Sequence, residues 1–494
     1  YFKRKCDYWE KQGVRTDSVG LYTRLTKQWY DWERDLYVRN GKCFGVYELG
    51  KPVLYLSDPD LIRDVLVKDF HEFTTGDPMF ENMVFMARDS EWKRIRAVMS
   101  PTFTTGKLGK MTPLIRECVD TMTDNFDKLI AKSGAKLAAP VDVKPIAGAF
   151  SMESIIQVAF GRKVSALDDP KNPIIENARK LFSTNFWTMV KFTLLLFAPS
   201  VAKMLNLSPF DQKVAEFYRN FTLNLIDDRK RDEGNGSPVK RVDFLQLMLD
   251  SMKDNKKTIN DSEDYTDSKS DEKYREIQPT DDMIDKSLSY DEVIAQCVLF
   301  FMAGYETTAT TLSLCLYTIA KHPEVQQKLY QEIQTFHGNK KSGADSYETL
   351  MSMKYLEAVI AETQRLYPGA IFVERVANED YELRGTGITI KKDHIVHIPI
   401  YAMHRDPDYF TDPELFRPER FLAENIAHNP YTYLPFGAGP RNCLGMRLAQ
   451  LEIKLALVSL VHRYVFHTTE KPLEFGFSGG LKTPKSVELR VERR

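Results

Sequence analysis

Apolar residues recur at helical spacing over most of the chain, and one stretch is apolar on nearly every face. This stretch, Tyr290 to Lys321, predicts a buried helix of ~45 Å, long enough to cross a whole domain. Helical patterns also occur over these ranges: Trp92–Lys128 with a break at Ser100-Pro101, Lys144–Phe160, Ile175–Phe186, Pro209–Arg231, Glu324–Phe336, Lys354–Tyr367, and a long helix from Met446. The pattern therefore predicts a mainly α fold with a long central buried helix.

Strand patterns are fewer and shorter. Phe44–Tyr47 and Val53–Leu56 flank a turn with Gly and Pro, which predicts a β-hairpin. Ile371–Ile400 and about 30 residues at the C-terminal end also have a β-like pattern, so small β-sheets are expected. Residues 251–287 are dominated by polar side chains and predict a mobile polar loop. The helices beside this loop are too apolar to stand alone, so we expect one domain over residues 1–494.

Composition and charge exclude several classes of protein. The formal net charge is −1, and no basic stripe with interleaved aromatic residues is present, which argues against a nucleic-acid partner. The six cysteines are scattered without a CxxC pair, which indicates a reducing compartment and neither a disulfide scaffold nor a zinc site. Lys3, Arg4 and Lys5 follow Tyr1, as in the cytoplasmic flank of a membrane anchor or in an ordinary charged terminus.

One cysteine stands in an unusual setting, Phe436-Gly437-Ala438-Gly439-Pro440-Arg441-Asn442-Cys443-Leu444-Gly445. Two glycines and a proline predict a tight turn that ends at a helix N-terminus, where free N–H groups stabilise a thiolate. Such a thiolate could be a nucleophile, a redox thiol or a metal ligand. None of the nine histidines stands in an obvious motif, so an activating base is neither supplied nor excluded. A buried structural cysteine is the alternative, but the pattern fixes too many positions at once for chance.

The middle of the buried helix carries Ala303-Gly304-Tyr305-Glu306-Thr307-Thr308. A glycine there costs about 1 kcal/mol, and a buried carboxylate costs more unless it is hydrogen-bonded. A pair of small residues admits a flat cofactor or a diatomic ligand, and a threonine hydroxyl can hold water or bond back to the helix. The competing interpretation is a kink in the helix beside a buried carboxylate that is hydrogen-bonded within the protein.

Two further groups of residues could form polar interactions, one as a structural triad and one as a binding site for a carboxylate. Glu362 and Arg365 share one helical face, and Arg420 follows on a proline-rigid segment. If Arg420 reaches Glu362, an Arg–carboxylate–Arg triad anchors the loop before the cysteine. Trp92 and Arg96, four residues apart, suit a carboxylate on a large apolar ligand, or else a tryptophan with an arginine stacked over it.

In this order, the motifs resemble those of the cytochrome P-450 family, the haem-thiolate monooxygenases. The matching residues are Trp92 with Arg96, Ala303-Gly304-x-Glu306-Thr307-Thr308, Glu362-x-x-Arg365 with Pro418-x-Arg420-Phe421, and Phe436 to Cys443-x-Gly445. The resemblance covers essentially the whole chain, and its cysteine motif is highly specific. Residues 91–104 look most like the microsomal branch, with its vertebrate drug- and steroid-oxidising and invertebrate detoxification members. The resemblance implies a single P-450 catalytic domain on the cytoplasmic face of the endoplasmic reticulum membrane, with the N-terminal anchor missing from this chain.

The family's roles pass to the matching residues. Cys443 would be the axial thiolate ligand of the iron of haem b. The resemblance places Trp92, Arg96, Arg375 and Arg441 at the haem propionates, and Phe436, Gly437, Gly439 and Gly445 around the sulfur. Gly304 would open a groove for O2, while Glu306 and Thr307 would order water and deliver protons. Glu362, Arg365 and Arg420 would form the structural triad.

The resemblance also implies ligands and partners. An apolar substrate would lie among Phe80–Met86, Phe182–Trp187, Phe300–Thr308, Ala370–Val373 and Phe477–Leu481. Phe192–Leu207 is either a segment that dips into a membrane surface or a buried helix. No flavin- or nicotinamide-binding glycine motif is present, so electrons would come from NADPH through a separate reductase, with a cytochrome b-type protein as a further donor. The face of this chain that docks the reductase would be basic, and the candidate residues are Lys93, Arg94, Arg447 and Lys454.

Three functions are compatible with the sequence. The first is a monooxygenase that inserts one oxygen atom from O2 into an apolar xenobiotic, steroid or fatty-acid-like molecule. The second is a family member that rearranges a peroxide or dehydrates its substrate, and the third is a non-catalytic haem-binding protein. Gly304, Glu306 and Thr307 favour the first, because rearranging members often differ there or carry an insertion in the cysteine loop.

Overall fold

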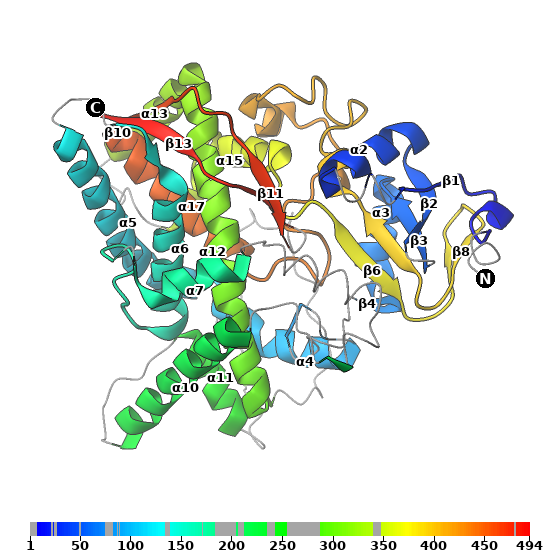
Figure 1. Ribbon diagram of the computed structural model, residues 1–494, viewed down its shortest axis with the longest axis horizontal. Coiled ribbons are helices and arrows are strands. Elements are labelled where there is room, and N and C mark those ends of the chain that lie inside the picture. Colours follow the sequence, from blue (N-terminus) through cyan, green and yellow to red (C-terminus); the bar gives the residue numbers. More distant parts are fainter. Residues whose placement is uncertain are drawn as a thin grey trace.

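The longest helix of the computed structural model is α12 (Tyr290–Lys321), with the bounds expected from the sequence (Figure 1). Its start is fixed by a capping box: the Ser289 hydroxyl accepts from the Glu292 N–H, and the Glu292 carboxylate accepts from the Ser289 N–H at 2.7 Å. Its end is fixed by Pro323, because the residue before a proline disfavours helical geometry. The 32 residues span ~48 Å, and most of their side chains are buried.

The structure describes residues 7–20, 23, 27–48, 51–74, 83–85, 87, 89–133, 139–169, 171–182, 204–205, 212–234, 243–253, 287–338, 347–478 and 481–494. These residues are mostly helical with small sheets, which confirms the predicted fold class. In this part of the chain, no helix combines enough length and apolarity to cross a membrane.

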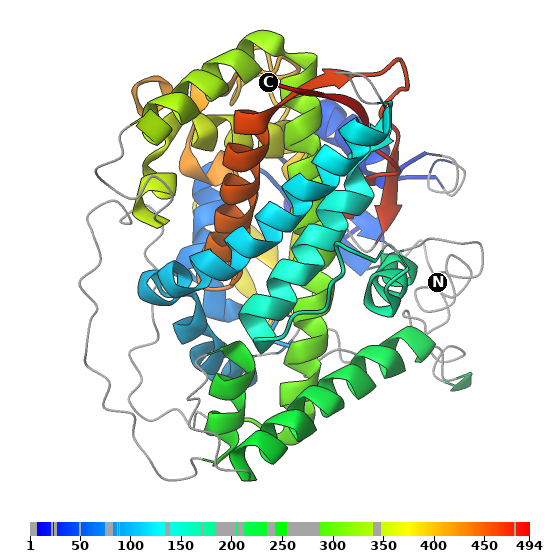
Figure 2. The same cartoon turned by 90° about the vertical axis from the view of Figure 1, so that its left-hand side faces the viewer.

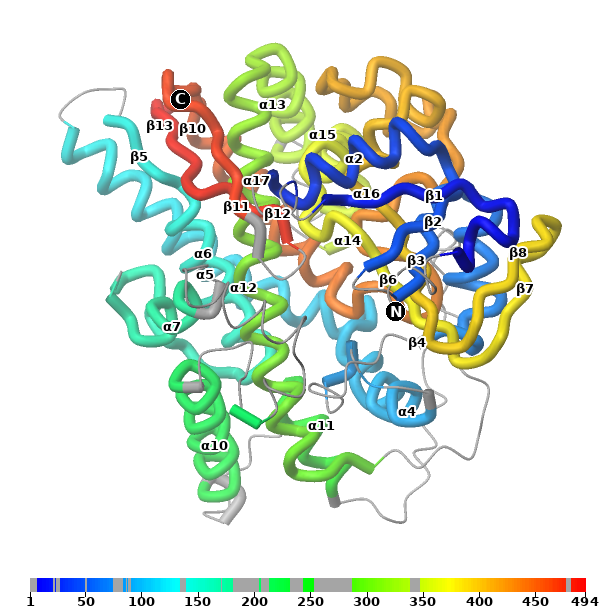
Figure 3. Tube along the Cα trace, turned by 45° about the vertical axis from the view of Figure 1, so that its right-hand side comes forward, coloured from blue at the N-terminus to red at the C-terminus, as the bar shows by residue number. Residues whose placement is uncertain are grey.

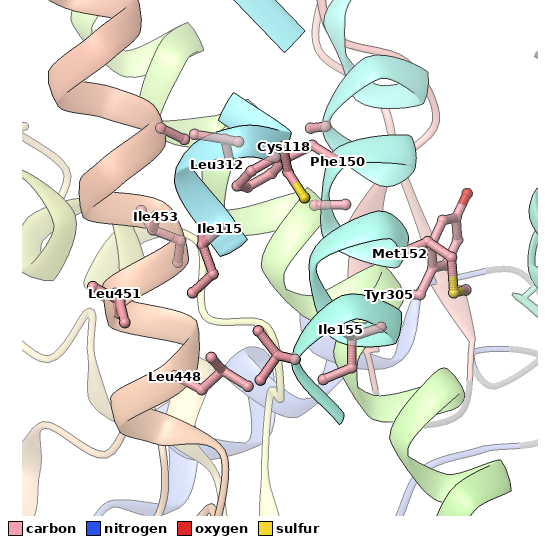
Figure 4. Packing of buried hydrophobic residues seen from close by; sticks show 14 of the residues in the cluster. Ile115, Cys118, Phe150, Met152, Ile155, Tyr305, Leu312, Leu448, Leu451 and Ile453 are labelled. Atoms are coloured by element: carbon pink, nitrogen blue, oxygen red, sulfur yellow. The ribbon is translucent and has the colours of Figure 1, made fainter. Parts of the chain in front are cut away.

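The helices α6 (Val143–Phe160) and α17 (Met446–Arg463) pack against α12, and α5 (Thr105–Ser133) packs in turn on α6 and α17 (Figure 2). Their facing side chains form the largest apolar core of the protein. Figure 4 shows part of this core, with the labelled residues Ile115 and Cys118 of α5, Phe150, Met152 and Ile155 of α6, Tyr305 and Leu312 of α12, and Leu448, Leu451 and Ile453 of α17. The core therefore holds α12 on several sides and fixes the residues in its middle.

The remaining α-helices are α2 (Trp29–Asn40), α3 (Pro59–Arg63), α4 (Asp89–Met99), α7 (Pro173–Phe182), α10 (Gln212–Gly234), α11 (Phe244–Lys253), α13 (Pro323–Gly338), α14 (Tyr347–Ser352), α15 (Lys354–Leu366) and α16 (Ile400–Met403). Short helical turns are η2 (Glu10–Gln12), η3 (Asp64–Lys68), η4 (Phe70–Glu72), η6 (Ser100–Phe103), η8 (Pro418–Phe421), η9 (Ala423–Asn425) and η10 (Pro430–Thr432).

Most predicted helices are present, with differences at their ends. The break at Ser100-Pro101 is the 3-10 turn η6 between α4 and α5, which confirms that prediction. The predicted loop 251–287 was placed too early, because α11 continues to Lys253 on an apolar face that includes Met248 and Leu249. Residues 254–286 of that loop, and 183–186 of the predicted helix Ile175–Phe186, lie outside the described residues.

The largest sheet joins segments from both ends of the chain. Its order is β1 (Thr16–Asp17), β2 (Cys43–Glu48), β3 (Lys51–Leu56), β9 (Ile395–Ile398), β6 (Val373–Ala377) and β4 (Phe73–Thr74). Strands β2 and β3 form the predicted hairpin, with Gly45 opposite Leu54, and β3 then pairs in parallel with β9, with Val53 opposite Ile395. In Figure 3 this sheet lies beside α2 and α16.

The described residues also form three smaller sheets. They are β10 (Tyr464–Thr468) with β13 (Glu488–Arg493) and β5 (Val141–Asp142), β11 (Phe475–Ser478) with β12 (Leu481–Pro484), and β7 (Tyr381–Leu383) with β8 (Ile388–Ile390). The strands after residue 463 confirm the predicted β-like C-terminal region. The two-stranded β11–β12 sheet lies near α2 and α16 in Figure 3.

Candidate active site

The chain reverses sharply before Cys443. Gly437 and Gly439 have φ angles of 72° and 73°, a conformation that costs residues with a side chain ~1–2 kcal/mol. Gly439 also touches the backbone of η3, where a Cβ atom would lie 1.9 Å from the Leu66 carbonyl oxygen. The Cys443 N–H closes the turn on the Phe436 carbonyl at 2.9 Å. The structure therefore forms the tight turn predicted from the two glycines, and η3 fixes its position.

Cys443 is exposed at the surface of the fold, but its thiol lies deep enough for burial to affect its protonation. It stands two residues before Gly445, the N-cap of α17. Burial raises the pKa of the thiol, while the Gly445 N–H and the charge of Arg96 lower it by less. The N–H at the helix N-terminus thus favours the thiolate, as expected, but by less than burial disfavours it. Deprotonation requires a stronger partner, and a coordinated metal ion supplies one.

A cationic and aromatic cluster adjoins the cysteine turn. Arg96 donates to the carbonyl oxygen of Asn442 at 2.9 Å and to its side-chain Oδ1 at 2.6 Å. The Arg441 guanidinium lies 4.4 Å from the centre of the Trp92 ring and donates to the Ala87 carbonyl at 3.0 Å. Trp92 and Arg96 therefore lie together, as their spacing predicts, and Arg441 joins them from the turn itself.

Arg375 on β6 adds a third guanidinium. It is 6% exposed and donates to the backbone carbonyl of Glu374 at 2.8 Å. Burial and the nearby charge of Arg441 lower the pKa of Arg375 to about 9. Among the described residues, no carboxylate forms an ion pair with it, so its buried charge calls for an anion. This donor set fits a planar ligand that carries carboxylates and binds a metal through Cys443, as the expected haem does.

Thr307 lies on a partly exposed stripe of α12. Ala303, one turn earlier, is exposed, and the Thr307 hydroxyl donates to its carbonyl oxygen at 2.6 Å. Thr311, one turn later, donates in the same way to the Thr307 carbonyl at 2.9 Å. Hydroxyls that bond back in this manner weaken the backbone ladder and bend a helix. No hydrogen bond or ion pair among the described residues joins Thr307 to the cysteine turn.

Gly304 serves the contact between α12 and α6. A Cβ atom at this position would lie 2.9 Å from the Cγ1 atom of Ile155. The Ser151 hydroxyl, also on α6, donates a short hydrogen bond to the Gly304 carbonyl oxygen. The absent side chain therefore permits close helix packing, a reason for the glycine that is independent of any ligand.

Glu306 is buried and paired on a different face from Thr307. Its Oε1 atom lies 2.7 Å from Nζ of Lys144, in the first turn of α6. The Thr310 hydroxyl also donates to Oε1, at 3.4 Å. Lys144 in turn donates to the Pro484 carbonyl at 2.8 Å. The structure thus joins Glu306 to α6 and the C-terminal strands, and this lysine partner was not foreseen from the sequence.

The two arginines of the expected triad meet on one carboxylate. Arg365 and Glu362 are fully buried, and the guanidinium binds both carboxylate oxygens, at 2.8 and 2.9 Å. Arg420 Nε reaches Glu362 Oε1 at 3.1 Å, and the backbone N–H of Arg417 reaches the same oxygen at 2.9 Å. Arg365 also donates to the His404 carbonyl. This network ties α15 to the segment that leads to the cysteine turn.

The proposed reductase-docking charges are only partly available. Arg94 forms an ion pair with Glu292 and donates to the backbone of Ser287. Lys454 is 1% exposed and binds Glu357 at 2.5 Å. For Lys454, the expectation of a displayed docking charge is therefore wrong, because this side chain is buried. Arg94 is partly exposed, and its charge is paired with that of Glu292. Lys93 and Arg447 remain partly exposed.

The segments expected to line the substrate pocket are described in part. Ala370 and Leu481 form a β-bridge, which brings two of these segments together. Phe300–Thr308 lies within α12. Residues 80–82, 86, 183–187 and 479–480 of the other segments lie outside the described residues, as do residues 192–203 and 206–207 of the segment expected at a membrane surface.

A buried histidine between two acids was not foreseen from the sequence. His397 on β9 lies between Glu33 of α2 and Glu374 of β6. Its only local signal is a histidine inside the apolar strand Ile395–Ile398, and both partners are distant in the sequence. In the sheet, Glu374 is opposite His397 and the next residue, Arg375, is opposite Val396, so the Arg375 side chain points to the other face of the sheet.

Comparisons with known proteins agree with this site. Residues 20–491 match the family described as Cytochrome P450. The chain is 38% identical over 488 residues to "Cytochrome P450 3A6" of Oryctolagus cuniculus, covering 96% of this chain and 90% of the relative. It is 36% identical over 510 residues to "Cytochrome P450 3A11" of Mus musculus (100% and 94%), and 37% identical over 490 residues to "Cytochrome P450 3A7" of Homo sapiens (96% and 90%). With the cysteine turn, the arginine cluster and a match over nearly its whole length, the chain belongs to the cytochrome P450 family of haem-iron monooxygenases.

Proposed function

We propose that this protein is a haem-thiolate monooxygenase that inserts one oxygen atom from O2 into an apolar xenobiotic, steroid or fatty-acid-like molecule. Two electrons from NADPH, passed on by a separate reductase, and two protons would reduce the other oxygen atom to water. The observation that carries the proposal is the exposed Cys443 thiol beside a cluster of arginines, where Arg375 has no carboxylate partner among the described residues. One sulfur and several cations match one metal and the carboxylates of its porphyrin.

The haem, when bound, supplies oxygen activation, and the protein supplies orientation and protons. Arg96, Arg375 and Arg441 would orient the ring through its carboxylates. The hydroxyl of Thr307, while donating to the Ala303 carbonyl, keeps lone pairs that can accept a hydrogen bond from water. We therefore assign to Thr307 Oγ1 the holding of a water molecule on the proton path. Glu306 would feed protons to that path only after release from Lys144.

The ligand assignment is tested by replacing the sulfur. Cys443→Ser should abolish the red-shifted Soret band of the ferrous–CO complex, because that band requires thiolate ligation. Cys43→Ser, at a half-buried cysteine of β2, is the matched control and should keep the band. A Cys443→Ser protein that binds haem and retains the band would remove Cys443 as the ligand.

The role of Thr307 in proton delivery is tested by the coupling of NADPH consumption to product formation. Thr307→Ala should keep haem but release oxygen as hydrogen peroxide, so that product formed per NADPH falls on the order of tenfold or more. Thr311→Ala, one turn along the same stripe, is the control and should change this ratio little. Equal coupling in wild type and Thr307→Ala would contradict the role.

Turnover separates this function from its alternatives. Reductase-dependent NADPH consumption matched by product supports a monooxygenase. Product without NADPH or O2 would indicate a rearranging or dehydrating member, and ligand binding without any turnover would indicate a non-catalytic haem protein. The intact Gly304, Glu306 and Thr307 favour the first, because rearranging members of the family often differ at these positions.

Residues 1–494 are proposed as one catalytic domain at the cytoplasmic face of the endoplasmic reticulum membrane. Met204 and Leu205, in the segment expected to touch a membrane, are 78% and 53% exposed. Exposed apolar side chains of this kind favour contact with lipid.

A further inference from the structure

A buried lysine lies inside a cage of aromatic rings behind the C-terminal hairpin. Lys482 belongs to β12 and is 6% exposed. Its ammonium lies 4.0 Å from the ring centre of Tyr30, 4.1 Å from that of Tyr401 and 4.5 Å from that of Phe475. All three distances are within the range of a cation–π contact. One side chain therefore connects α2, α16 and β11 to β12.

The backbone of Lys482 also contacts the segment that follows α15. Its N–H donates to the Gly369 carbonyl at 3.1 Å, and its neighbour Leu481 forms a β-bridge with Ala370. The Tyr401 N–H, at the opposite side of the cage, donates to the Ile371 carbonyl at 2.9 Å. The cage thus fixes β12 against the segment that follows α15, beside two of the segments expected to line the substrate pocket.

The hairpin depends on such an anchor. Among the described residues, β11 and β12 pair as strands with each other and form one bridge to Ala370, and the Lys144 side chain donates to the Pro484 carbonyl of β12. A two-stranded hairpin is marginally stable by itself, so side-chain contacts decide where it sits. Phe475 contributes a second contact, stacking on Tyr367 of the segment after α15 at 5.6 Å between ring centres.

The ammonium lies among charges of both signs. Burial and Arg405 lower the pKa of Lys482 to about 7, and Arg34 acts in the same direction. The carboxylates of Asp31 and Glu414 oppose this change. The three rings attract only the protonated amine and so also favour the charged form. Protonation of Lys482 therefore strengthens the cage.

We propose that Lys482 is a specificity-determining positioning residue whose caged ammonium holds the β11–β12 hairpin against Ala370 and so sets one wall of the substrate pocket. The inference rests on the proposed function for the identity of that pocket. Apolar ligands large enough to touch both Leu481 and Ala370 would depend on the cage, whereas small apolar ligands would not.

The test uses the full-length haem protein and two measurements. Lys482→Met keeps the length of the side chain and removes its charge, while Lys482→Arg keeps a cation for the rings. The matched control is Lys485→Met, an exposed lysine just beyond β12 that pairs with Glu474 at the surface. The dissociation constants of one large and one small apolar ligand are measured from the shift of the ferric Soret band. Hydrogen exchange of residues 475–484 is measured in parallel.

We expect Lys482→Met to change the ratio of the two dissociation constants at least fivefold and to speed hydrogen exchange in the hairpin at least tenfold. Lys482→Arg and Lys485→Met should stay within twofold of wild type on both measurements. If Lys482→Met fails to bind haem, Phe475→Leu, which removes one ring of the cage, should give the same two changes. The inference would be overturned if the variant that binds haem, Lys482→Met or otherwise Phe475→Leu, left hydrogen exchange in the hairpin unchanged. It would also be overturned if Lys485→Met changed this exchange as much. Failure of the proposed function is distinguishable, since it would appear as ligand binding by the wild type without reductase-dependent turnover.

Discussion

His397 gives a quantitative prediction about pH and stability. Its Nε2 lies 2.6 Å from Glu33 Oε1, its Nδ1 lies 2.8 Å from Glu374 Oε1, and the ring is 1% exposed. Both ring nitrogens face carboxylate oxygens, so both must carry protons for the two hydrogen bonds to form. Although burial disfavours the charge, the two carboxylates outweigh it and raise the pKa of His397 to about 10. The imidazolium joins α2, β9 and β6.

The magnitude follows from linkage between protonation and folding. A rise from 6.5 to about 10, at 1.36 kcal/mol per pKa unit, corresponds to at most about 5 kcal/mol of stability. Because the folded protein holds the proton more tightly than the unfolded chain, this stability is fully present below pH 6.5. It is lost as the pH rises through 10, with a slope of up to about 1.4 kcal/mol per pH unit between these values.

The assay compares urea denaturation of wild type and His397→Gln at pH 8, 9 and 10. His397→Gln should be less stable at pH 8, because Glu33 loses its cationic partner in a fully buried site. The difference in unfolding free energy should shrink as the pH rises. His467→Gln, at a half-exposed histidine of β10 that pairs with Glu492, is the control and should show a small difference. A difference that stays constant or grows from pH 8 to pH 10 would refute the charged state of His397.

Three further predictions concern other parts of the molecule. Glu362→Gln should lower the free energy of unfolding by about 3–5 kcal/mol, because two arginines lose the carboxylate that they share. Urea denaturation measures this loss. The control is Asp7→Asn, at an exposed ion pair, which should cost under about 1 kcal/mol. Gly439→Ala should sharply reduce haem content, since its Cβ would overlap the η3 backbone, whereas Gly106→Ala meets nothing and should bind haem normally. Raising the pH from 6 to 8.5 should move the wild-type ratio of large- to small-ligand dissociation constants toward that of Lys482→Met, because Lys482 loses its proton near pH 7.

Elements with local signals were the most predictable from the sequence. The bounds of α12 follow from its uninterrupted apolar pattern and from Pro323 beyond its end. The Gly437–Gly439 turn follows from glycines, which adopt a left-handed backbone without a steric cost. By contrast, the pairing of β3 with β9 joins strands more than 300 residues apart, and nothing in either strand specifies its partner. The early start of the predicted loop at residue 251 has a similar cause, since polar residues conceal the last turn of an amphipathic helix.

The motif on α12 shows most clearly where sequence reasoning reaches its limit. Adjacent residues of a helix point about 100° apart, so Glu306 and Thr307 cannot face the same neighbour without a bend. The sequence names the acid and the hydroxyl as a pair, but the direction of each depends on what packs against α12. Lys144 on α6 holds the acid at 2.7 Å, whereas the hydrogen bonds of Thr307 to described residues lie within its own helix. The proton path that we propose therefore requires the carboxylate to leave an ion pair, and a weaker pair would release protons toward Thr307 more readily.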